Sequence, residues 1–487
     1  MLIKNNATFF FRKKKINLFR YDRSKLIPKW LHIGPGNFHR SHQAFYLHNL
    51  LNQNRSNWSI LNFDILKNKK NISLCSKLKK QDCLYSLITR KYNNTSNYSL
   101  IGCINNFLIT SSHNIKLILN NIFKKEICMI SLTITENGYF FKNNQFDIKN
   151  FLIKKDIYSN ECNTIYGFLY IILKTLIKAK HRITVLSCDN ILNNSSTLRS
   201  GLKSFCVLKN NKIVTKIDRH MTFPNSMVDR ITPKFKPKNI NIIFKKFGYT
   251  DKCVVESEEY SSWIIEDKIN TEFPNFHFVG VQFVDDIKSY QNMKMKMLNA
   301  SHCSTSFLGS LTRFKFVHQT FNNKIFVEFI KKYLDEDVIP SLKKNFYNYS
   351  SFKNEILKRF SNKNLLDTVE RTTVNGSKNL EIFIKPSLKY CFKKNKNLKR
   401  FALIYASWFV FLLKIYKANK LKKLDDENKH SIKKIFEDKD IIESYLKNHE
   451  FPHIKNYIND TFKVKLKFYV KLLQSNQVKK ALSDAIQ

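Results

Sequence analysis

The chain has 487 residues, of which 43% are hydrophobic, so it can form two or three domains with a substantial core. Its 84 Lys and Arg residues exceed its 38 Asp and Glu residues by 46, a surplus typical of proteins that bind polyanions. The lysines are spread along the whole chain, however, and glycine is scarce, at 10 of 487 residues. A global substitution bias explains this pattern more simply than a nucleic-acid surface. We therefore predict no nucleic-acid partner.

The ten cysteines include no CxxC pair and no Cys/His cluster with zinc spacing, which predicts reduced thiols and no metal site. The apolar run that precedes the basic block near the N-terminus is too short for a signal peptide. The longest apolar run, from Phe401 to Leu413, is too short to span a membrane and predicts a buried helix. We expect a cytoplasmic protein without a membrane partner, either a monomer or a small homo-oligomer.

Residues 1–28 form a basic lead-in, and a short apolar strand follows at 30–33. The strand runs into Gly34 and Gly36 and then into a helix that we expect to continue through Leu51. A strand, a glycine turn and a helix open a dinucleotide-binding fold, in which the helix N-terminus faces a pyrophosphate. The third glycine of G-x-G-x-x-G is missing and His39 stands in its place, while Pro35 removes one backbone donor.

Further apolar strands are predicted at 58–63, 127–134, 183–187 and 279–284, separated by helical stretches such as 164–180. Continuous apolar strands that alternate with helices indicate a parallel sheet. From residue 286 onward the pattern is almost wholly helical. We therefore predict an α/β fold class, with a Rossmann-type dinucleotide-binding domain at 29–285 followed by a mostly α-helical substrate and catalytic domain at 286–487.

The stretch 291–302 brings together a lysine, an amide and an imidazole. On an α-helix Asn299 lies about 140° and His302 about 80° from Lys294, whereas Lys296 points to the opposite, solvated side. Such a trio can take a proton from a hydroxyl group and stabilise the oxygen that remains. The alternative is a basic amphipathic helix with an incidental histidine.

The run KMKMLNASH, at 294–302, resembles the signature of the polyol-specific long-chain dehydrogenases, the mannitol dehydrogenase family. GPGNFHRSHQA resembles the family's GxGxFHRAHQA element, and SLTITENGY, SCDN and PNSMVDRITP are similar to further elements, so the resemblance covers residues 29 to about 415. It implies an NAD(P)-dependent oxidoreductase with a sugar or polyol substrate. The cofactor-binding residues that it implies are Ile33, Gly34, Pro35, Gly36, Asn37, Phe38, His39, Asp64, Thr135, Glu136 and Asn190.

The same resemblance assigns catalysis to Lys294, Asn299 and His302. Its substrate-binding residues are these three together with Asn190, Asp229, Arg371 and Lys378. For Asp229 the alternative is a salt bridge with Arg230 or another base. The family's second basic position after the arginine falls on Asn379, and an acidic residue is common in the family where Gln291 stands.

The expected position of the ribose-binding acid holds lysines, including Lys69 and Lys70, and Asp64 comes early. The cofactor is therefore expected to be NAD, with NADP as the alternative because a basic residue there suits a 2′-phosphate. The resemblance implies metal-independent interconversion of D-mannitol and D-fructose by hydride transfer, with Lys294 as the acid/base. Fructuronate reduction is the nearest alternative. A basic nucleic-acid-binding protein and a decayed enzyme that folds without turnover are the others.

Overall fold

The computed structural model describes residues 16–66, 68–142, 145–159, 161–448 and 454–487. The chain separates into two compact units, residues 1–288 and 289–487. The strands of the first unit are β1 Ile27–Ile33, β2 Trp58–Asp64, β3 Tyr85–Arg90, β4 Ser96–Ile101, β5 Ile104–Ile109, β6 Met129–Leu132, β7 Phe141–Lys142, β8 Gln145–Phe146, β9 Ile183–Ser187, β10 Met221–Thr222, β11 Ser226–Asp229, β12 Val255–Glu258, β13 Ser262–Glu266 and β14 Gln282–Val284.

The helices of the first unit are α1 Asn37–Ser41, α2 Gln43–Asn52, α3 Lys69–Lys80, α4 Ser112–Phe123, α5 Phe151–Tyr158, α6 Ile165–Ala179, α7 Asn194–Asn210, α8 Ile217–His220 and α9 Lys238–Phe247. The predicted strands at 58–63 and 183–187 correspond to β2 and β9, and the predicted helix at 164–180 corresponds to α6. The segment at 279–284 is less regular than expected. It contains the end of a 3-10 turn, Phe276–Val279, and the short strand β14.

A six-stranded parallel sheet forms the centre of the first unit, with strand order β10-β9-β6-β1-β2-β5. The chain passes from β1 to β2 and β5 on one side of β1 and then returns to β6 on the other side. The strand order thus reverses between β1 and β6, and in open parallel sheets ligands bind outside the carboxyl ends of the strands at such a reversal. This topology confirms the predicted Rossmann-type fold.

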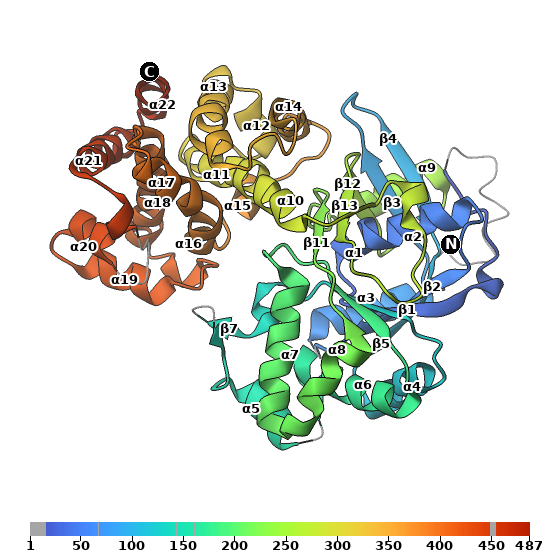
Figure 1. Ribbon diagram of the computed structural model, residues 1–487. Coiled ribbons are helices and arrows are strands. Elements are labelled where there is room, and N and C mark those ends of the chain that lie inside the picture. The colour runs from blue at the N-terminus through green and yellow to red at the C-terminus, as the bar shows by residue number, and fades with distance from the viewer. Residues whose placement is uncertain (1–15, 67, 143–144, 160, 449–453) are drawn as a thin grey trace. The chain divides into compact units, whose positions relative to one another are not determined.

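Helices cover both faces of the six-stranded sheet (Figure 1). Leu31 and Ile33 of β1 pack on one face with buried side chains of α4, α6 and α7. Trp30 points to the other face and packs with side chains of α2. Every residue of β2 is buried, and each fully buried large apolar side chain stabilises the fold by about 1.5–3 kcal/mol. Burial on both faces explains why these strands are continuously apolar in sequence.

The helix expected to run from the glycine turn to Leu51 is in fact two helices, α1 and α2. The break lies at His42, whose backbone has φ −117° and ψ −83°. Its ring stacks on Phe38 at 4.9 Å, and its Nε2–H donates to the carbonyl oxygen of Ser262 at 2.9 Å. The prediction of one continuous helix is wrong because these tertiary contacts hold His42 outside helical geometry.

The second unit is helical, which confirms the prediction for this part of the chain. After α10, Ile287–Met293, and a π-helical turn, Lys294–Asn299, it contains α11 Ala300–Leu311, α12 Val317–Phe321, α13 Lys324–Lys332, α14 Tyr349–Phe360, α15 Val369–Thr372, α16 Gly376–Asn379, α17 Lys385–Lys393, α18 Lys399–Lys417, α19 Lys429–Glu437, α20 Ile441–Lys447, α21 Asp460–Gln474 and α22 Val478–Ile486. Helix α18 includes the apolar run at 401–413 and packs against α11 and α21, as expected for a buried helix.

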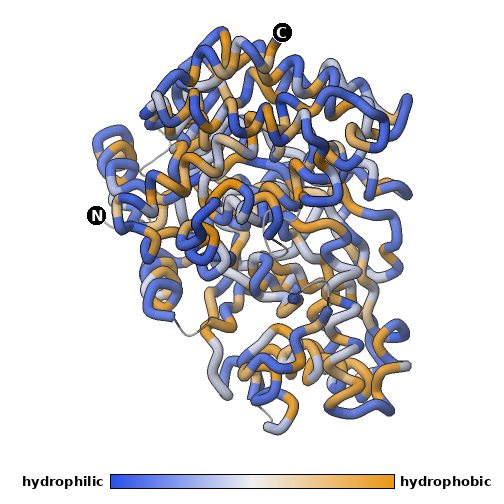
Figure 2. The backbone as a smooth tube through the Cα atoms, turned by 90° about the vertical axis from the view of Figure 1, so that its left-hand side faces the viewer, coloured by the Kyte–Doolittle hydropathy of each residue, from blue (hydrophilic) through white to orange (hydrophobic). Residues whose placement is uncertain are grey.

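Hydrophobic stretches are short and alternate with hydrophilic ones along the backbone (Figure 2). Among the described residues, no helix has the length and apolar character needed to cross a bilayer. Part of the basic lead-in is folded against the first unit, because Arg23 donates to the carbonyl oxygens of Gly102 at 2.9 Å and Asp82 at 2.7 Å. Residues 1–15 of the lead-in lie outside the described residues.

Candidate active site

The glycine turn after β1 has the geometry of a dinucleotide-binding turn. Gly34 has φ 109°, and a Cβ atom there would lie 2.5 Å from the carbonyl oxygen of Thr133, which follows β6. Gly36 has ordinary backbone angles, and a Cβ atom there would meet no protein atom within 4 Å. The first glycine is therefore required by the close approach of two strands, whereas the second leaves open space of the kind that a pyrophosphate needs.

Arg40 holds this turn in place, a role that could not be predicted from the sequence beyond its position in the motif. Its side chain is 2% exposed. Its guanidinium donates to the carbonyl oxygen of Pro35 at 3.3 Å, to Asn37 Oδ1 at 2.7 Å and to the carbonyl oxygen of Cys253. Pro35 thus contributes a carbonyl acceptor in a turn where it offers no backbone donor. The predicted cofactor residue Asn37 is held by a partner within its own helix.

His39 occupies the place of the third glycine and stacks on His32 of β1. The two rings are 3.3 Å apart and nearly parallel, at 8°. His32 Nδ1 lies 2.6 Å from Ser131 Oγ, and His32 Nε2 lies 3.1 Å from Thr133 Oγ1. Burial lowers the pKa of His32 to about 3 and holds the pKa of His39 well below its usual value. Two neutral flat rings therefore replace the close helix–strand packing that a glycine provides.

Asp64 is the last residue of β2, at the same sheet edge as the glycine turn. Its Oδ1 accepts the N–H of Leu66 at 3.2 Å, and burial raises the pKa of its carboxyl group. Lys69 and Lys70 are exposed in the first turn of α3. The structure thus places one carboxylate and two lysines after β2, which matches both the NAD and the NADP expectations from the sequence.

Thr135, Glu136 and Asn190 follow the ends of β6 and β9, so they lie at this edge as well. Thr135 and Asn190 are exposed, and Glu136 is half-buried. Thr135 has φ 62° and ψ 166°, a conformation that non-glycine residues rarely adopt. The side chain of Ile33 is buried in the core instead, so only its backbone faces the edge.

Asp229 ends β11 and is buried, with its backbone paired to Ser262 of β13. The neighbouring Arg230 is also buried. Its Nε donates to the carbonyl oxygen of Glu258 at 3.1 Å, its Nη1 donates to the carbonyl oxygen of Ser41, and its Nη2 lies 3.4 Å from Thr89 Oγ1. These backbone and hydroxyl acceptors hold the guanidinium in place.

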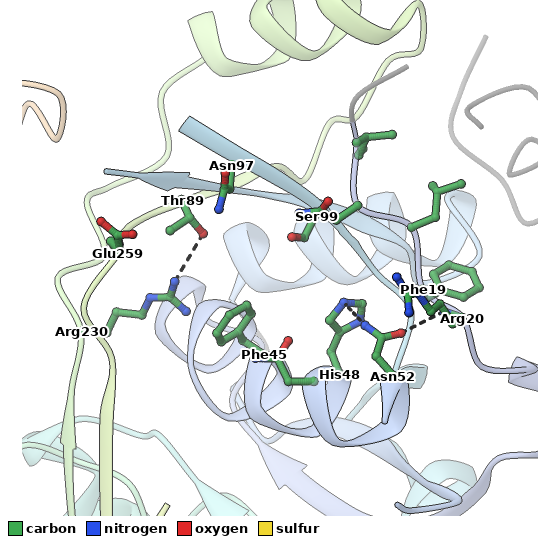
Figure 3. A pocket seen from close by; sticks show the side chains of 14 residues that line it. Phe19, Arg20, Phe45, His48, Asn52, Thr89, Asn97, Ser99, Arg230 and Glu259 are labelled. Carbon is green, nitrogen blue, oxygen red and sulfur yellow. Dashed lines mark hydrogen bonds between the residues drawn. The ribbon is translucent and has the colours of Figure 1, made fainter. Parts of the chain in front are cut away.

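A cavity of about 960 Å³ lies beside α2 and the β3–β4 hairpin (Figure 3). Arg230 and Phe45 line one end of it, and His48 and Asn52 line the other. Its described lining residues include none of the predicted catalytic, cofactor or substrate residues. The sheet edge at β1 and β6, rather than this cavity, is therefore the candidate cofactor site.

In the second unit, Lys294 to Asn299 form a π-helical turn that continues into α11. A π turn takes up one more residue than an α turn, so Asn299 lies roughly 40° and His302 roughly 20° from Lys294 around the axis. The trio is therefore closer to one line than the α-helical expectation of 140° and 80°. Lys294 is 7% exposed. The His302 ring stacks on Phe360 at 3.9 Å and 4°, and Asn299 Nδ2 contacts Met295 Sδ at 3.2 Å.

Lys296 is not on a solvated side, contrary to the sequence expectation. It is half-buried, and its Nζ donates to the carbonyl oxygen of Ser341 at 3.2 Å. Burial lowers its pKa. The expectation is wrong because an angular count on one helix does not show that a later segment covers the opposite face.

The helices that carry Arg371 and Lys378, α15 and α16, pack against α11. Arg371 donates through Nε and Nη2 to both carboxylate oxygens of Asp367, with Nε at 2.6 Å. Lys378 Nζ lies 3.4 Å from Glu427. Asn379 Nδ2 donates to the carbonyl oxygen of Val374 at 2.9 Å. Both predicted substrate cations thus lie on helices that contact α11, which carries the predicted catalytic residue His302, and each has an acidic partner in the second unit.

The described residues contain no group of three or more His, Cys, Asp or Glu side chains arranged to hold a metal ion. The chemistry that this arrangement allows is proton transfer and hydrogen bonding by a lysine, an amide and an imidazole. The glycine turn and its open approach fit a dinucleotide.

Comparisons with known proteins agree with a dinucleotide-binding domain that is followed by a helical domain. The mannitol dehydrogenase Rossmann domain matches residues 28–277, and the mannitol dehydrogenase C-terminal domain matches residues 286–469. Mannitol dehydrogenase 2 of Saccharomyces cerevisiae is 31% identical over 405 residues, which cover 80% of this chain and 79% of that protein. A polyol:NADP oxidoreductase of Gluconobacter oxydans is 28% identical over 397 residues, 80% of this chain and 81% of the relative.

Two solved structures resemble the whole chain. The Pseudomonas fluorescens mannitol 2-dehydrogenase ternary complex with NAD and D-mannitol has a TM-score of 0.88 and 28% identity, with 99% of each chain covered. A D-sorbitol dehydrogenase in substrate-free form has a TM-score of 0.85 and 25% identity, and 99% of this chain and 100% of that chain are covered.

Proposed function

This chain belongs to the mannitol dehydrogenase family, as its motifs predicted, and is an NAD(P)-dependent oxidoreductase that acts on a CH–OH group; from this premise we propose that it interconverts D-mannitol and D-fructose. The family and the related structures support polyol dehydrogenase activity. The observation that carries the choice of a neutral sugar is the bidentate pair between Arg371 and Asp367.

We propose that residues 29–285 bind the cofactor and that residues 286–487 supply the acid/base and substrate-binding groups. NAD, when bound, supplies the hydride chemistry. The backbone at Gly34 and Gly36 admits the pyrophosphate, and Arg40 keeps this turn in place through Pro35 and Asn37. The binding turn is organised by the protein's own contacts, which reduces the ordering cost of cofactor binding.

Lys294 is proposed to take the proton from the reacting hydroxyl group in oxidation and to return it to the carbonyl oxygen in reduction. Lys294 is 7% exposed, so bulk water has little access to its amino group. Asn299 and His302 lie on the same helix face and are proposed to donate hydrogen bonds to the developing oxyanion. A well-placed donor of this kind typically stabilises the transition state by about 3–4 kcal/mol. We propose that the reaction needs no metal ion.

The acidic partners of Arg371 and Lys378 favour a substrate whose terminus is a hydroxyl group rather than a carboxylate. A uronate is best held by a cationic fork that is free to pair with it. Arg371 already uses Nε and Nη2 for Asp367, and Lys378 lies beside Glu427. Asn379, where the family has a basic residue, is neutral. A second carboxylate brought to these groups would compete with the acidic partners that they already have.

A substrate screen tests the proposal. Purified protein is assayed for NADH and NADPH oxidation with fructose, fructuronate and tagatose, and for the reverse reaction with mannitol. We expect the highest kcat/KM in reduction for fructose. A higher kcat/KM for fructuronate that is lost in the Lys378→Ala variant would instead support the fructuronate reductase alternative.

A further inference from the structure

Asp189 ties together the ends of two neighbouring strands at the cofactor edge. It lies two residues after β9, and its side chain is 8% exposed. Its carboxylate accepts the backbone N–H groups of Ile134 at 3.1 Å and Thr135 at 2.9 Å, and the hydroxyl of Tyr139 at 2.8 Å. Three donors from the segment after β6 therefore converge on one carboxylate.

The carboxylate stabilises a segment that is strained. Thr135, one of the predicted cofactor residues, has φ 62° and ψ 166°, which costs free energy for a residue with a Cβ atom. Its N–H is one of the groups that Asp189 accepts. Such strained conformations persist only where surrounding contacts fix them, and they concentrate at functional sites.

The backbone of Asp189 is fixed from the opposite direction by Asn194. Asn194 Nδ2 donates to the carbonyl oxygen of Asp189 at 3.1 Å and to that of Ser226 at 2.9 Å, and its Oδ1 accepts the N–H of Ser226 at 3.0 Å. Ser226 begins β11, the strand that ends at Asp229. Asn190 therefore directly follows a residue that is tied to the segment after β6 through its carboxylate and, through Asn194, to β11.

We propose that Asp189 is a positioning residue whose ionised carboxylate holds segment 134–139 and Asn190 in the conformation that binds NAD. Asp189 acts through these neighbours and is not assigned a contact with the substrate or the cofactor. The inference depends on NAD as the cofactor but not on which polyol is oxidised.

The titration of Asp189 gives this role a distinctive signature. Burial raises its pKa to about 6, with its hydrogen-bond donors acting in the opposite direction. A protonated carboxyl group would place an O–H against donors that need an acceptor, so the three hydrogen bonds belong to the ionised form of Asp189. The charged or titratable groups facing Asp189 are Tyr139, Cys188 and Glu136. Burial raises the pKa of both Tyr139 and Cys188 further above neutrality, so neither of these titrates near pH 6.

NADH binding to the intact protein, measured by fluorescence titration between pH 5 and 8, tests the proposal without any turnover. In Asp189→Asn, an amide N–H replaces one acceptor oxygen and faces donors. This variant should bind NADH about 10-fold more weakly at pH 7.5, the scale of one lost charged hydrogen bond, and should lack any pH dependence near pH 6 that Asp189 causes in the wild type.

Asp156→Asn is the matched control. Asp156 is also a buried carboxylate of the first unit, and it accepts the N–H groups of Asn163 and Thr164, each at 2.8 Å, beside the start of α6. Its loss should lower the unfolding temperature and leave the NADH Kd and its pH profile unchanged. If Asp189→Asn does not fold, Tyr139→Phe, which removes one of the three donors, should weaken NADH binding about 3-fold. Wild-type NADH affinity and pH dependence in either folded variant would overturn the proposal, whichever polyol proves to be the substrate.

Discussion

Replacing Gly34 and Gly36 separately should divide fold stability from cofactor binding. In Gly34→Ala the new Cβ meets the carbonyl oxygen of Thr133 at 2.5 Å, and the residue must keep φ 109°. Backbone strain of this kind costs about 1–3 kcal/mol, and overpacking of a buried contact costs about 1–3 kcal/mol more. We therefore expect a loss of about 2–6 kcal/mol, which lowers the unfolding temperature by roughly 5 to 20 °C for a unit of this size.

Gly36→Ala is the matched comparison two residues away. Gly36 has φ −60°, which alanine adopts freely, and its Cβ would meet no protein atom within 4 Å. The unfolding temperature should stay within about 2 °C of the wild type, because surface changes away from special features cost little. The NADH Kd should nevertheless rise at least about 10-fold, because the methyl group occupies the approach of the pyrophosphate. Thermal unfolding and NADH titration are both measured on each variant. A Gly34→Ala protein as stable as the wild type, or normal NADH binding by Gly36→Ala, would refute the interpretation of the turn.

Three further predictions concern catalysis, cofactor choice and pH. Lys294→Ala should lower kcat at least about 100-fold while the circular dichroism spectrum is unchanged, and near-normal turnover would remove this lysine from the mechanism. Lys69 and Lys70 are exposed in the first turn of α3, after Asp64. The kcat/KM for NADH should therefore exceed that for NADPH by less than about 100-fold, which corresponds to roughly 2.7 kcal/mol. A larger preference for NADH would contradict this prediction. Burial lowers the pKa of His48 to about 3, so between pH 6.5 and 3 the unfolded chain binds a proton there that the folded chain does not. The free energy of unfolding should therefore decrease as the pH decreases from 6.5 to 3, by up to about 1.4 kcal/mol per pH unit from this histidine. In urea titrations, His48→Gln should show a smaller change of unfolding free energy per pH unit than the wild type, and an equal change would contradict the prediction.

The parts of this molecule that local patterns determine could be predicted from the sequence. The apolar runs at β2, β9 and α18 have the period and length of buried elements, so their types were predictable, and for β2 and β9 the bounds were predictable to within one residue. The glycine turn was predictable because two glycines follow a strand. By contrast, the break at His42 depends on Ser262, more than two hundred residues later. No local pattern contains that contact.

The candidate site shows the same division between local and long-range information. Motif resemblance identified Lys294, Asn299 and His302, but not the π turn, which sets their angular spacing. The ion pair of Arg371 with Asp367 has a helical i, i+4 spacing and was in principle visible in the sequence. The roles of Arg40 and Asp189 depend on an acceptor at Cys253 and on donors at 134–139, which are distant in sequence, and only the folded structure shows these contacts.

Because of the π turn, the segment from Lys294 to Asn299 has one residue more than a regular α-helix would need to bring these two side chains to the same angular separation. An α-helix that lacked one of the intervening residues would place the amide four positions and the imidazole seven positions after the lysine, at about 40° and 20° from it. The same angular arrangement of the three groups can thus be formed either by the π turn or by an α-helix that is one residue shorter. A one-residue deletion at the partly exposed Lys296 should preserve that order, whereas a deletion between Asn299 and His302 should turn the imidazole about 100° away from the lysine. We thus expect this helix to tolerate a change of length on the N-terminal side of Asn299 and not on its C-terminal side.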